Sequence, residues 1–284
     1  MIPDSNKNSD DLRVQLKQKS TDELIQLALT SRDDEGDAPS WDAIWALRYR
    51  ATREVFEAAK TLCESHDPLK RMVGVDILAQ LGLPTRSYLD ETLDIFFNLI
   101  DTEQDNRVLN SVGVGLGHIS PEPRKVKPLL KLKNHPDPEV RFGVASGLCC
   151  EEDPLAIQAL IELSSDEDPD VRDWAAFALG TQIDVDTPQI RAALFKRVSD
   201  PDDDSDAPGE ALLGLAKRHD ERAFEVIVQH LEAGNAGILI FEAAISLADP
   251  RLYSSLVKLR DDPDYANSER DSLEDAIVAC KNQV

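Results

Sequence analysis

Several kinds of residue are scarce in this chain of 284 residues. Aromatic side chains make up 5% of it, there are two methionines, and the four cysteines are Cys63, Cys149, Cys150 and Cys280. This small number of cysteines, without a CxxC spacing, does not match a disulfide framework or a zinc site. We therefore expect buried, reduced thiols.

Basic residues are scarce relative to acidic ones. The chain has 31 lysines and arginines against 54 aspartates and glutamates, which gives a formal net charge of −23. Such a charge repels phosphate backbones and anionic lipid, so we expect neither nucleic-acid nor membrane binding. A cluster of basic residues lacks interleaved aromatics and is interpreted as a solvated helix face. It consists of Arg124, Lys125, Lys127, Lys131 and Lys133. The acidity favours a basic protein partner or, with nearly equal weight, solubility alone.

Long apolar runs and catalytic motifs are missing too. No stretch approaches a membrane span and no secretory signal is found, so a cytoplasmic location is expected. The five histidines make no HExxH or comparable spacing. The alternating aspartates of 200–206 suggest a calcium loop, but Ala207 and Leu213 stand where an EF-hand needs glycine and glutamate. The sequence predicts no enzyme, no cofactor and no metal.

What the chain has instead is an internal repeat. The segment DPDVRDWAAFALG at 168–180 is echoed by HPDPEVRFGVASGL at 135–148, DPLKRMVGVDIL at 67–78 and QDNRVLNSVGVG at 104–115. Each copy has a turn with Asp or Pro, a basic residue, and then a run of small and aliphatic residues. Equivalent apolar positions follow one another at about 30 to 36 residues, which is typical of helical solenoids.

Burial explains why such a repeat folds as an array. Each unit supplies two helices, and neither covers its apolar stripe until the next unit stacks on it. Small residues of the second helix, such as Ala175 and Ala178, are expected to face the stacking helix. The prediction is an all-α protein, an α-α superhelix of about eight helical pairs. It would form a single domain over 20–284 after a loose arm over 1–19.

The repeat also predicts where the helices lie. The first helices of the pairs are expected near 21–30, 52–65, 89–101, 123–134, 154–165, 187–199, 220–233 and 250–260. The second helices are expected near 39–48, 68–81, 105–117, 137–149, 169–180, 207–217, 236–247 and 267–280.

A basic residue near the start of four second helices has two interpretations. These residues are Arg71, Arg107, Arg141 and Arg172. In one interpretation each guanidinium bonds an Asp or a carbonyl of an adjacent turn, which builds a ladder between repeats. In the other they form a basic stripe for an anionic ligand. An aspartate precedes each of them closely, so the ladder is favoured.

Three positions of the repeat vary freely, as an outward face should. In the copy that begins at Asp168 they are Asp173, Trp174 and Phe177, and all three tryptophans of the chain fall at such positions. Exposed aromatics among carboxylates are typical of an interface centre with an acidic rim. Packing residues within a curved stack are an equal alternative. The residues predicted to bind a partner are Trp41, Asp42, Trp45, Asp76, Phe142, Asp173, Trp174, Phe177, Glu210, Phe241 and Glu242.

The DPxVRxxAAxALG pattern at 137–148 and 168–180 resembles HEAT repeats, in the bacterial form described as phycobilisome-lyase-like. The resemblance covers about residues 20–280 and implies the fold much more strongly than a function. The STDELIQLA segment at 20–28 and the placement of VRDWAAFAL are also similar to small HEAT-repeat proteins encoded beside Rhs polymorphic-toxin elements. That similarity implies a role in toxin tolerance.

Three classes of function follow, and the negative charge disfavours the last of them, a HEAT-repeat protein that surveys DNA. The first is a non-catalytic, monomeric scaffold or adaptor that captures a basic protein on its concave face, with toxin immunity as one such role. The second, implied by the lyase-like repeat, is a phycobilin-lyase-type subunit or another HEAT-repeat enzyme accessory. No dedicated bilin site is recognisable in the sequence, and bilin absorbance of the purified protein would separate the first two.

Overall fold

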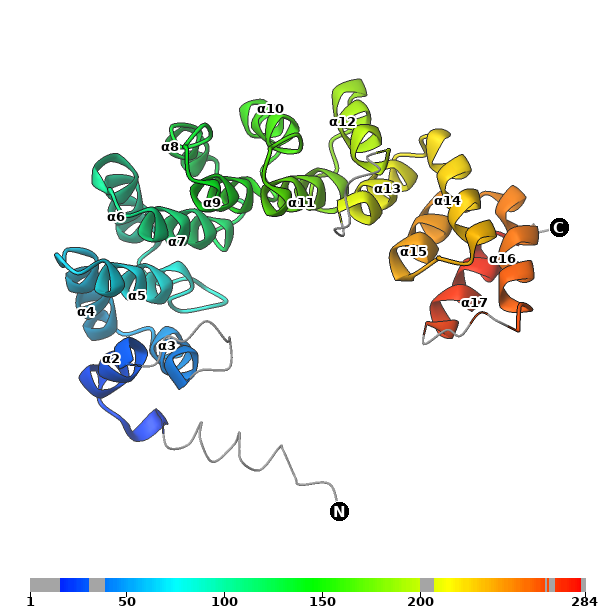
Figure 1. Ribbon diagram of the computed structural model, residues 1–284. Coiled ribbons are helices and arrows are strands. Elements are labelled where there is room, and N and C mark those ends of the chain that lie inside the picture. Colours follow the sequence, from blue (N-terminus) through cyan, green and yellow to red (C-terminus); the bar gives the residue numbers. More distant parts are fainter. Residues whose placement is uncertain (1–15, 31–38, 200–206, 264, 266–268, 282–284) are drawn as a thin grey trace, which may run out of the picture. The chain divides into compact units, whose positions relative to one another are not determined.

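Helices arranged in successive pairs make up the described part of this computed structural model (Figure 1). The structure describes residues 16–30, 39–199, 207–263, 265 and 269–281, and within these ranges it has helices and turns but no strand. The all-α repeat prediction is therefore confirmed. The chain divides into two compact units, 1–147 and 148–284, each of which is described by itself. Most of the predicted arm over 1–19 and the acidic segment 200–206 lie outside the described residues.

The described part of unit 1 contains four pairs. Its first helices are α2 (Thr21–Thr30), α4 (Arg53–Cys63), α6 (Leu89–Thr102) and η1 (Pro123–Lys125) with α8 (Val126–Leu130). Its second helices are α3 (Pro39–Arg50), α5 (Pro68–Ala79), α7 (Asn106–Gly117) and α9 (Pro138–Leu148). Helix α3 packs on α2, α5 packs on α4, and α5 contacts α7 of the next pair.

Unit 2 continues the same order. Its first helices are α10 (Pro154–Leu163), α12 (Pro188–Val198), α14 (Arg222–Ala233) and η3 (Pro250–Leu252) with α16 (Tyr253–Arg260). Its second helices are α11 (Pro169–Phe177) with the π-helical turn η2 (Ala178–Gln182), α13 (Ala207–Lys217), α15 (Ile238–Leu247) and α17 (Arg270–Ala279). Each second helix contacts the next one, α11 with α13, α13 with α15, and α15 with α17. The predicted helices are all found, with ends that differ by a few residues.

Aspartate caps set where the second helices begin. The side chains of Asp67, Asp105 and Asp168 accept hydrogen bonds from backbone N–H groups of the first turns of α5, α7 and α11. These groups have no partner within the helix, so each cap contributes about 1 kcal/mol of stability. A proline follows Asp67 and Asp168 at the position where its missing N–H costs nothing.

Small residues allow the second helices to touch. Ala175 and Ala178 are fully buried, as expected from the sequence. A Cβ atom added to Gly113 of α7 would lie 2.5 Å from the backbone carbonyl carbon of Gly143 in α9. The backbones of α7 and α9 are therefore in direct contact, and a side chain at this point has no room.

Arg71, Arg141 and Arg172 stand at equivalent positions of the repeat, and each bonds a group of a neighbouring turn. Arg71 binds Glu103 of the next repeat with its Nε 2.5 Å from Oε2. Arg141 donates to the carbonyl of His135 at 2.9 Å, and Arg172 donates to the carbonyl of Asp166 at 3.1 Å. These bonds tie each helix to its neighbouring turn, as the structural interpretation requires.

Arg107 bonds an aspartate of its turn, as predicted, but it stands at a different position of the repeat from the other three arginines. It pairs with Asp105 of its own turn at 2.8 Å, and its side chain is exposed. The other three arginines stand four residues after their capping aspartates, for example Arg172 after Asp168. Four residues after Asp105 comes Leu109, which is buried. The sequence alignment was thus shifted by two residues in α7.

The interpretation of the basic cluster as a solvated helix face is wrong for Lys125. Its side chain is fully buried, and Nζ lies 3.0 Å from the carbonyl oxygen of Leu116, 2.9 Å from that of Ile119 and 2.6 Å from Oγ of Ser120. These acceptors lie at the carboxyl end of α7, where the helix dipole favours a cation. Lys125 is therefore a cap of α7.

Left-handed backbone residues close several second helices, among them Ala248 after α15, with φ of 49°. Glycine adopts this conformation without the strain that a Cβ brings. Ala248→Gly is therefore expected to raise the free energy of unfolding by up to about 1 kcal/mol, measured by chemical denaturation. Ala243→Gly, at a buried position within the same helix, should lower it. A loss of stability in Ala248→Gly would contradict this account of the turn.

Candidate partner-binding surface

Three large aromatic side chains lie exposed on one side of α3. Trp41, Trp45 and Tyr49 are 36%, 39% and 71% exposed, and their spacing of four residues places them in one row on the helix. The rings of Trp45 and Tyr49 stack with centroids 5.9 Å apart. The residues between them, such as Ile44 and Leu47, are fully buried. We call Trp41, Trp45 and Tyr49 the α3 aromatic stripe.

The buried side chain of Arg48 packs against the two tryptophans of this stripe. Its Nε and Nη2 donate to the carbonyl oxygen of Asp76 in α5, at 2.9 and 2.6 Å. Its guanidinium carbon lies 4.7 Å from the ring centroid of Trp45 and 5.9 Å from that of Trp41. Burial lowers the pKa of Arg48 to about 10, against the opposing effect of the Asp76 charge, so it stays a cation at neutral pH. Arg48 therefore holds the tryptophans by cation–π contact and links them to the next repeat.

A hollow of about 790 Å³ lies beside the stripe. Trp45, Tyr49, Asp42, Leu16 and Arg50 are among its lining residues. Arg50 donates to the carbonyl oxygen of Leu16 at 3.1 Å, which fixes one wall. The charged side chains at the hollow are the acidic Asp42 and the basic Lys17 and Arg50. A space of this size, mostly apolar with a few charged groups, is typical of binding sites.

Other predicted residues of unit 1 lie further along the second helices. Asp76 is half-buried, and its Oδ1 accepts a hydrogen bond from Oγ of Ser111 in α7 at 2.8 Å. The same side of α7 carries Asn110 and Val114, also half-buried. Phe142 is half-buried on α9, with α5 and α7 between it and α3 in chain order. We call the surface of unit 1 that carries the α3 aromatic stripe, Asp76 and Phe142 the second-helix face.

The predicted residues of unit 2 also gather on second helices. Asp173, Trp174 and Phe177 are half-buried on α11, where the two rings lie with centroids 5.5 Å apart. Glu210 is half-buried on α13, and Glu242 is exposed on α15. Compared with the stripe on α3, the aromatic pair on α11 is less accessible.

Phe241 does not belong to the surface, and its prediction is wrong. The side chain is fully buried. Helix α15 has its N-cap at Gly237, and the backbone N–H of Phe241 donates to the carbonyl of Gly237 at 3.2 Å. Phe241 thus stands four residues after its cap, where Arg172 stands after Asp168. The alignment was shifted by one residue in α15, so Glu242 takes the outward position.

Two surface features were missed by the sequence analysis. Tyr49 is the most exposed ring of the stripe, and its spacing of four residues from Trp45 was the signal that could have revealed it. In α7 the outward positions are taken by Ser111 and Val114, both half-buried, and the sequence analysis named no partner-binding residue in this helix. Counting from the capping aspartate would have revealed these positions.

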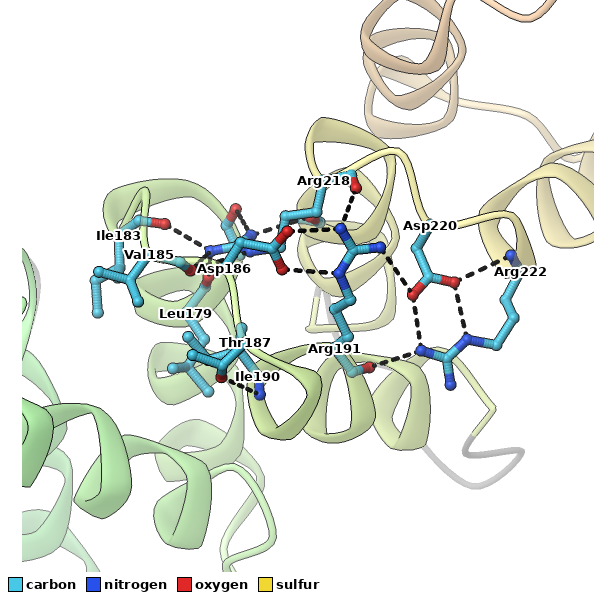
Figure 2. Close-up of polar contacts among 12 residues, drawn as sticks. Leu179, Ile183, Val185, Asp186, Thr187, Ile190, Arg191, Arg218, Asp220 and Arg222 are labelled. Atoms are coloured by element: carbon cyan, nitrogen blue, oxygen red, sulfur yellow. Dashed lines mark hydrogen bonds and ion pairs between the residues drawn. The ribbon is translucent and has the colours of Figure 1, made fainter.

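A network of charged residues fixes the turns of unit 2 (Figure 2). Arg218 is buried and donates to the carbonyl oxygens of Leu179, at 2.9 Å, and Ile183, at 2.6 Å, near the π-helical turn η2. Next to it, Asp220 receives two bonds at 2.8 Å from Arg222. Carbonyl and carboxylate acceptors thus surround the guanidinium groups and stabilise the turns.

The buried carboxylate of Asp220, paired with the partly exposed Arg222, predicts a pH-dependent contribution to stability. Hydrogen bonds from Arg222 lower the pKa of Asp220 to about 2 from its ordinary 3.8. A lowered pKa means that the stabilisation is present above pH 3.8 and is lost as the pH falls through about 2. Asp220→Asn should therefore lower the free energy of unfolding by about 2 kcal/mol at neutral pH.

Denaturation curves from pH 7 down to pH 2 test this. The variant and the parent should converge at the acid end. Asp261→Asn is the control, since Asp261 pairs with Arg260 at the surface and should contribute little. A difference for Asp220→Asn that stays constant with pH would contradict the assignment.

Other kinds of site were also sought in the described part of the chain. No group of three or more His, Cys, Asp and Glu side chains there is placed to hold a metal ion. None of its helices combines the length and the apolar character of a membrane span.

Comparison with known proteins gives the family. A family model described as HEAT repeats matches residues 93–180 and 157–248. The crystal structure of YibA from Escherichia coli is similar, with 23% sequence identity, a TM-score of 0.72, and coverage of 99% of this chain and 98% of that one. The structure of Kap121p is similar at 16% identity and a TM-score of 0.50, covering 93% of this chain and 28% of the other. No curated protein matches the sequence. Because the family model matches more than half of the chain, the protein belongs to the HEAT-repeat family.

Proposed function

We propose that this protein is a non-catalytic scaffold that holds a basic protein partner on its second-helix face. The α3 aromatic stripe is the observation that carries the proposal. The repeat fold needs small apolar residues on its second helices, yet here three large rings are left exposed beside a hollow. Exposed aromatics held in fixed positions are the usual anchors of protein interfaces.

The rigidity of the stripe supports binding over simple solvent exposure. Arg48 is held by two hydrogen bonds to α5 and contacts both tryptophans, so the rings are placed before a partner arrives. Side chains fixed in advance lose less conformational entropy on binding. The hollow beside Trp45 then accepts a side chain of the partner.

Charge supports a basic partner. The chain carries a net charge of −23, and Asp42 and Glu242 are exposed on second helices. A large net negative charge attracts a positive protein over long range and speeds its association at low salt. We infer further that the partner is a toxic protein that is silenced by capture. The resemblance to HEAT-repeat proteins encoded beside Rhs elements supports this role.

Affinity capture from lysate of the native cells tests the proposal. The tagged chain should retain a protein of basic isoelectric point, and increasing salt should weaken its capture. Asp42→Lys should slow association at low salt, whereas Glu54→Lys makes the same charge change on first helix α4, where the side chain is also exposed, and should have less effect. Equal effects of the two variants would contradict a role of the second-helix face.

Two further outcomes decide the finer role. Expression of the captured protein alone should slow growth, and co-expression of this chain should restore it if capture silences a toxin. A purified chain that carries the visible absorbance of a bilin would instead support a lyase-type subunit.

A further inference from the structure

The four cysteines of this chain are of two kinds. Cys63 and Cys280 are single, buried thiols, and burial raises their pKa to about 12 and about 11. They stay protonated at neutral pH and are poor nucleophiles. Cys149 and Cys150, by contrast, are adjacent after the end of α9, with their sulfur atoms 3.8 Å apart and no disulfide between them.

The backbone explains how two neighbouring side chains point at each other. Cys150 has φ of 64°, in the left-handed region that residues other than glycine rarely adopt. The chain turns sharply there, which places Sγ of Cys150 beside Sγ of Cys149. The same kind of turn follows other second helices at Ala51 and Ala248, so it belongs to the repeat. In this repeat it carries two thiols.

Accessibility differs between the two. Cys150 is half-buried, and its Sγ lies 3.7 Å from Oε1 of Gln182, whereas Cys149 is 8% exposed. A reagent from solution therefore reaches Cys150 first. Cys149 lies behind it, in the position of a thiol that resolves a mixed disulfide.

We propose that Cys149 and Cys150 form a reversible modification site that reacts with small-molecule disulfides. The thiolate of Cys150 attacks one sulfur of the disulfide, breaks its S–S bond and releases one thiol. The thiolate of Cys149 then attacks Sγ of Cys150 and releases the second thiol. The chain loses two protons and two electrons, and the small disulfide is reduced to two thiols. Closure brings the sulfur atoms from 3.8 Å to about 2 Å, and an excess of thiol reverses it.

Intact-mass spectrometry of the full chain with oxidised glutathione tests the proposal. The parent chain should lose the mass of two hydrogens and retain no glutathione, and a thiol reductant should reverse the loss. Cys149→Ala should instead accumulate one glutathione on Cys150, because no resolving thiol is present. Cys150→Ala should stay unmodified, since the buried Cys149 is out of reach. The double variant Cys63→Ala, Cys280→Ala is the control and should behave as the parent.

Phenylarsine oxide provides a second probe of the same pair. Its trivalent arsenic condenses with two close thiols and releases one water, without redox chemistry. The parent chain should bind one equivalent, and either single variant at the pair should lose the binding, with circular dichroism confirming that each variant is folded. Modification of Cys150→Ala at the parent's rate, or a parent chain that keeps a glutathione adduct and binds no arsenical, would overturn the proposal.

Discussion

Trp45→Ala is expected to weaken partner binding by about 2 kcal/mol, or about 30-fold in the dissociation constant, and to leave the helical signal unchanged. The ring is 39% exposed, lies against Arg48 and lines the hollow beside α3. It is thus positioned as an interface anchor whose removal leaves the core intact. Titration of the captured partner against the two chains measures the difference.

The control for this variant is another exposed apolar residue. Leu155 is 51% exposed on first helix α10, so Leu155→Ala removes a similar kind of surface away from the second-helix face. It should bind the partner as the parent does. Unchanged affinity in Trp45→Ala would show that the stripe is not the binding centre, and loss of helical signal would show that the ring belongs to the core.

Gly113→Ala should destabilise unit 1 by about 2 kcal/mol, because the new methyl group overpacks a contact between two backbones. Its Cβ would lie 2.5 Å from the carbonyl carbon of Gly143, and backbone cannot move aside as the end of a side chain can. The thermal midpoint of unfolding should fall by several degrees.

Gly115→Ala, two residues further along α7, is the matched control. Its Cβ would meet side-chain atoms of Ala79 and Phe96 at 3.2 Å, which calls for a shift of a few tenths of an ångström, and no backbone atom lies as close as at Gly113. Alanine also favours the helix over glycine by up to about 1 kcal/mol, so this variant should be near neutral. Equal destabilisation of the two would mean that α7 and α9 are not in backbone contact.

The helices could be predicted well because each repeat contains its helix-start signals and apolar spacing within its own short sequence. An aspartate before the first turn, a proline after it, and apolar residues at helical spacing are all visible in one copy, as at Asp168 and Pro169. The errors were of register. Copies differ in length, and aligning them by their apolar residues shifted α7 by two positions and α15 by one. Phe241 was therefore predicted to be exposed, whereas its side chain is fully buried.

The candidate surface was predicted in part for the same reason. Trp41 and Trp45 stood out as large residues at positions that the core does not need. The role of Arg48 was not predictable, because its acceptor is the backbone carbonyl of Asp76 in the next repeat. Lys125 was misread similarly, since its three acceptors come from the end of α7 and the following turn. Contacts between repeats are absent from the pattern of a single copy.

Photo-crosslinking measures most directly whether the second-helix face holds the partner. A photoreactive phenylalanine analogue replaces Tyr49, which is 71% exposed at the end of the α3 aromatic stripe, and in a second chain it replaces Glu54 on α4. Both chains are irradiated in native lysate, and crosslinked proteins are identified by mass spectrometry. We expect one basic protein to crosslink from position 49, to compete with unlabelled chain, and not to crosslink from position 54. Crosslinks from position 54 alone, or equally from both positions, would contradict the proposed binding surface.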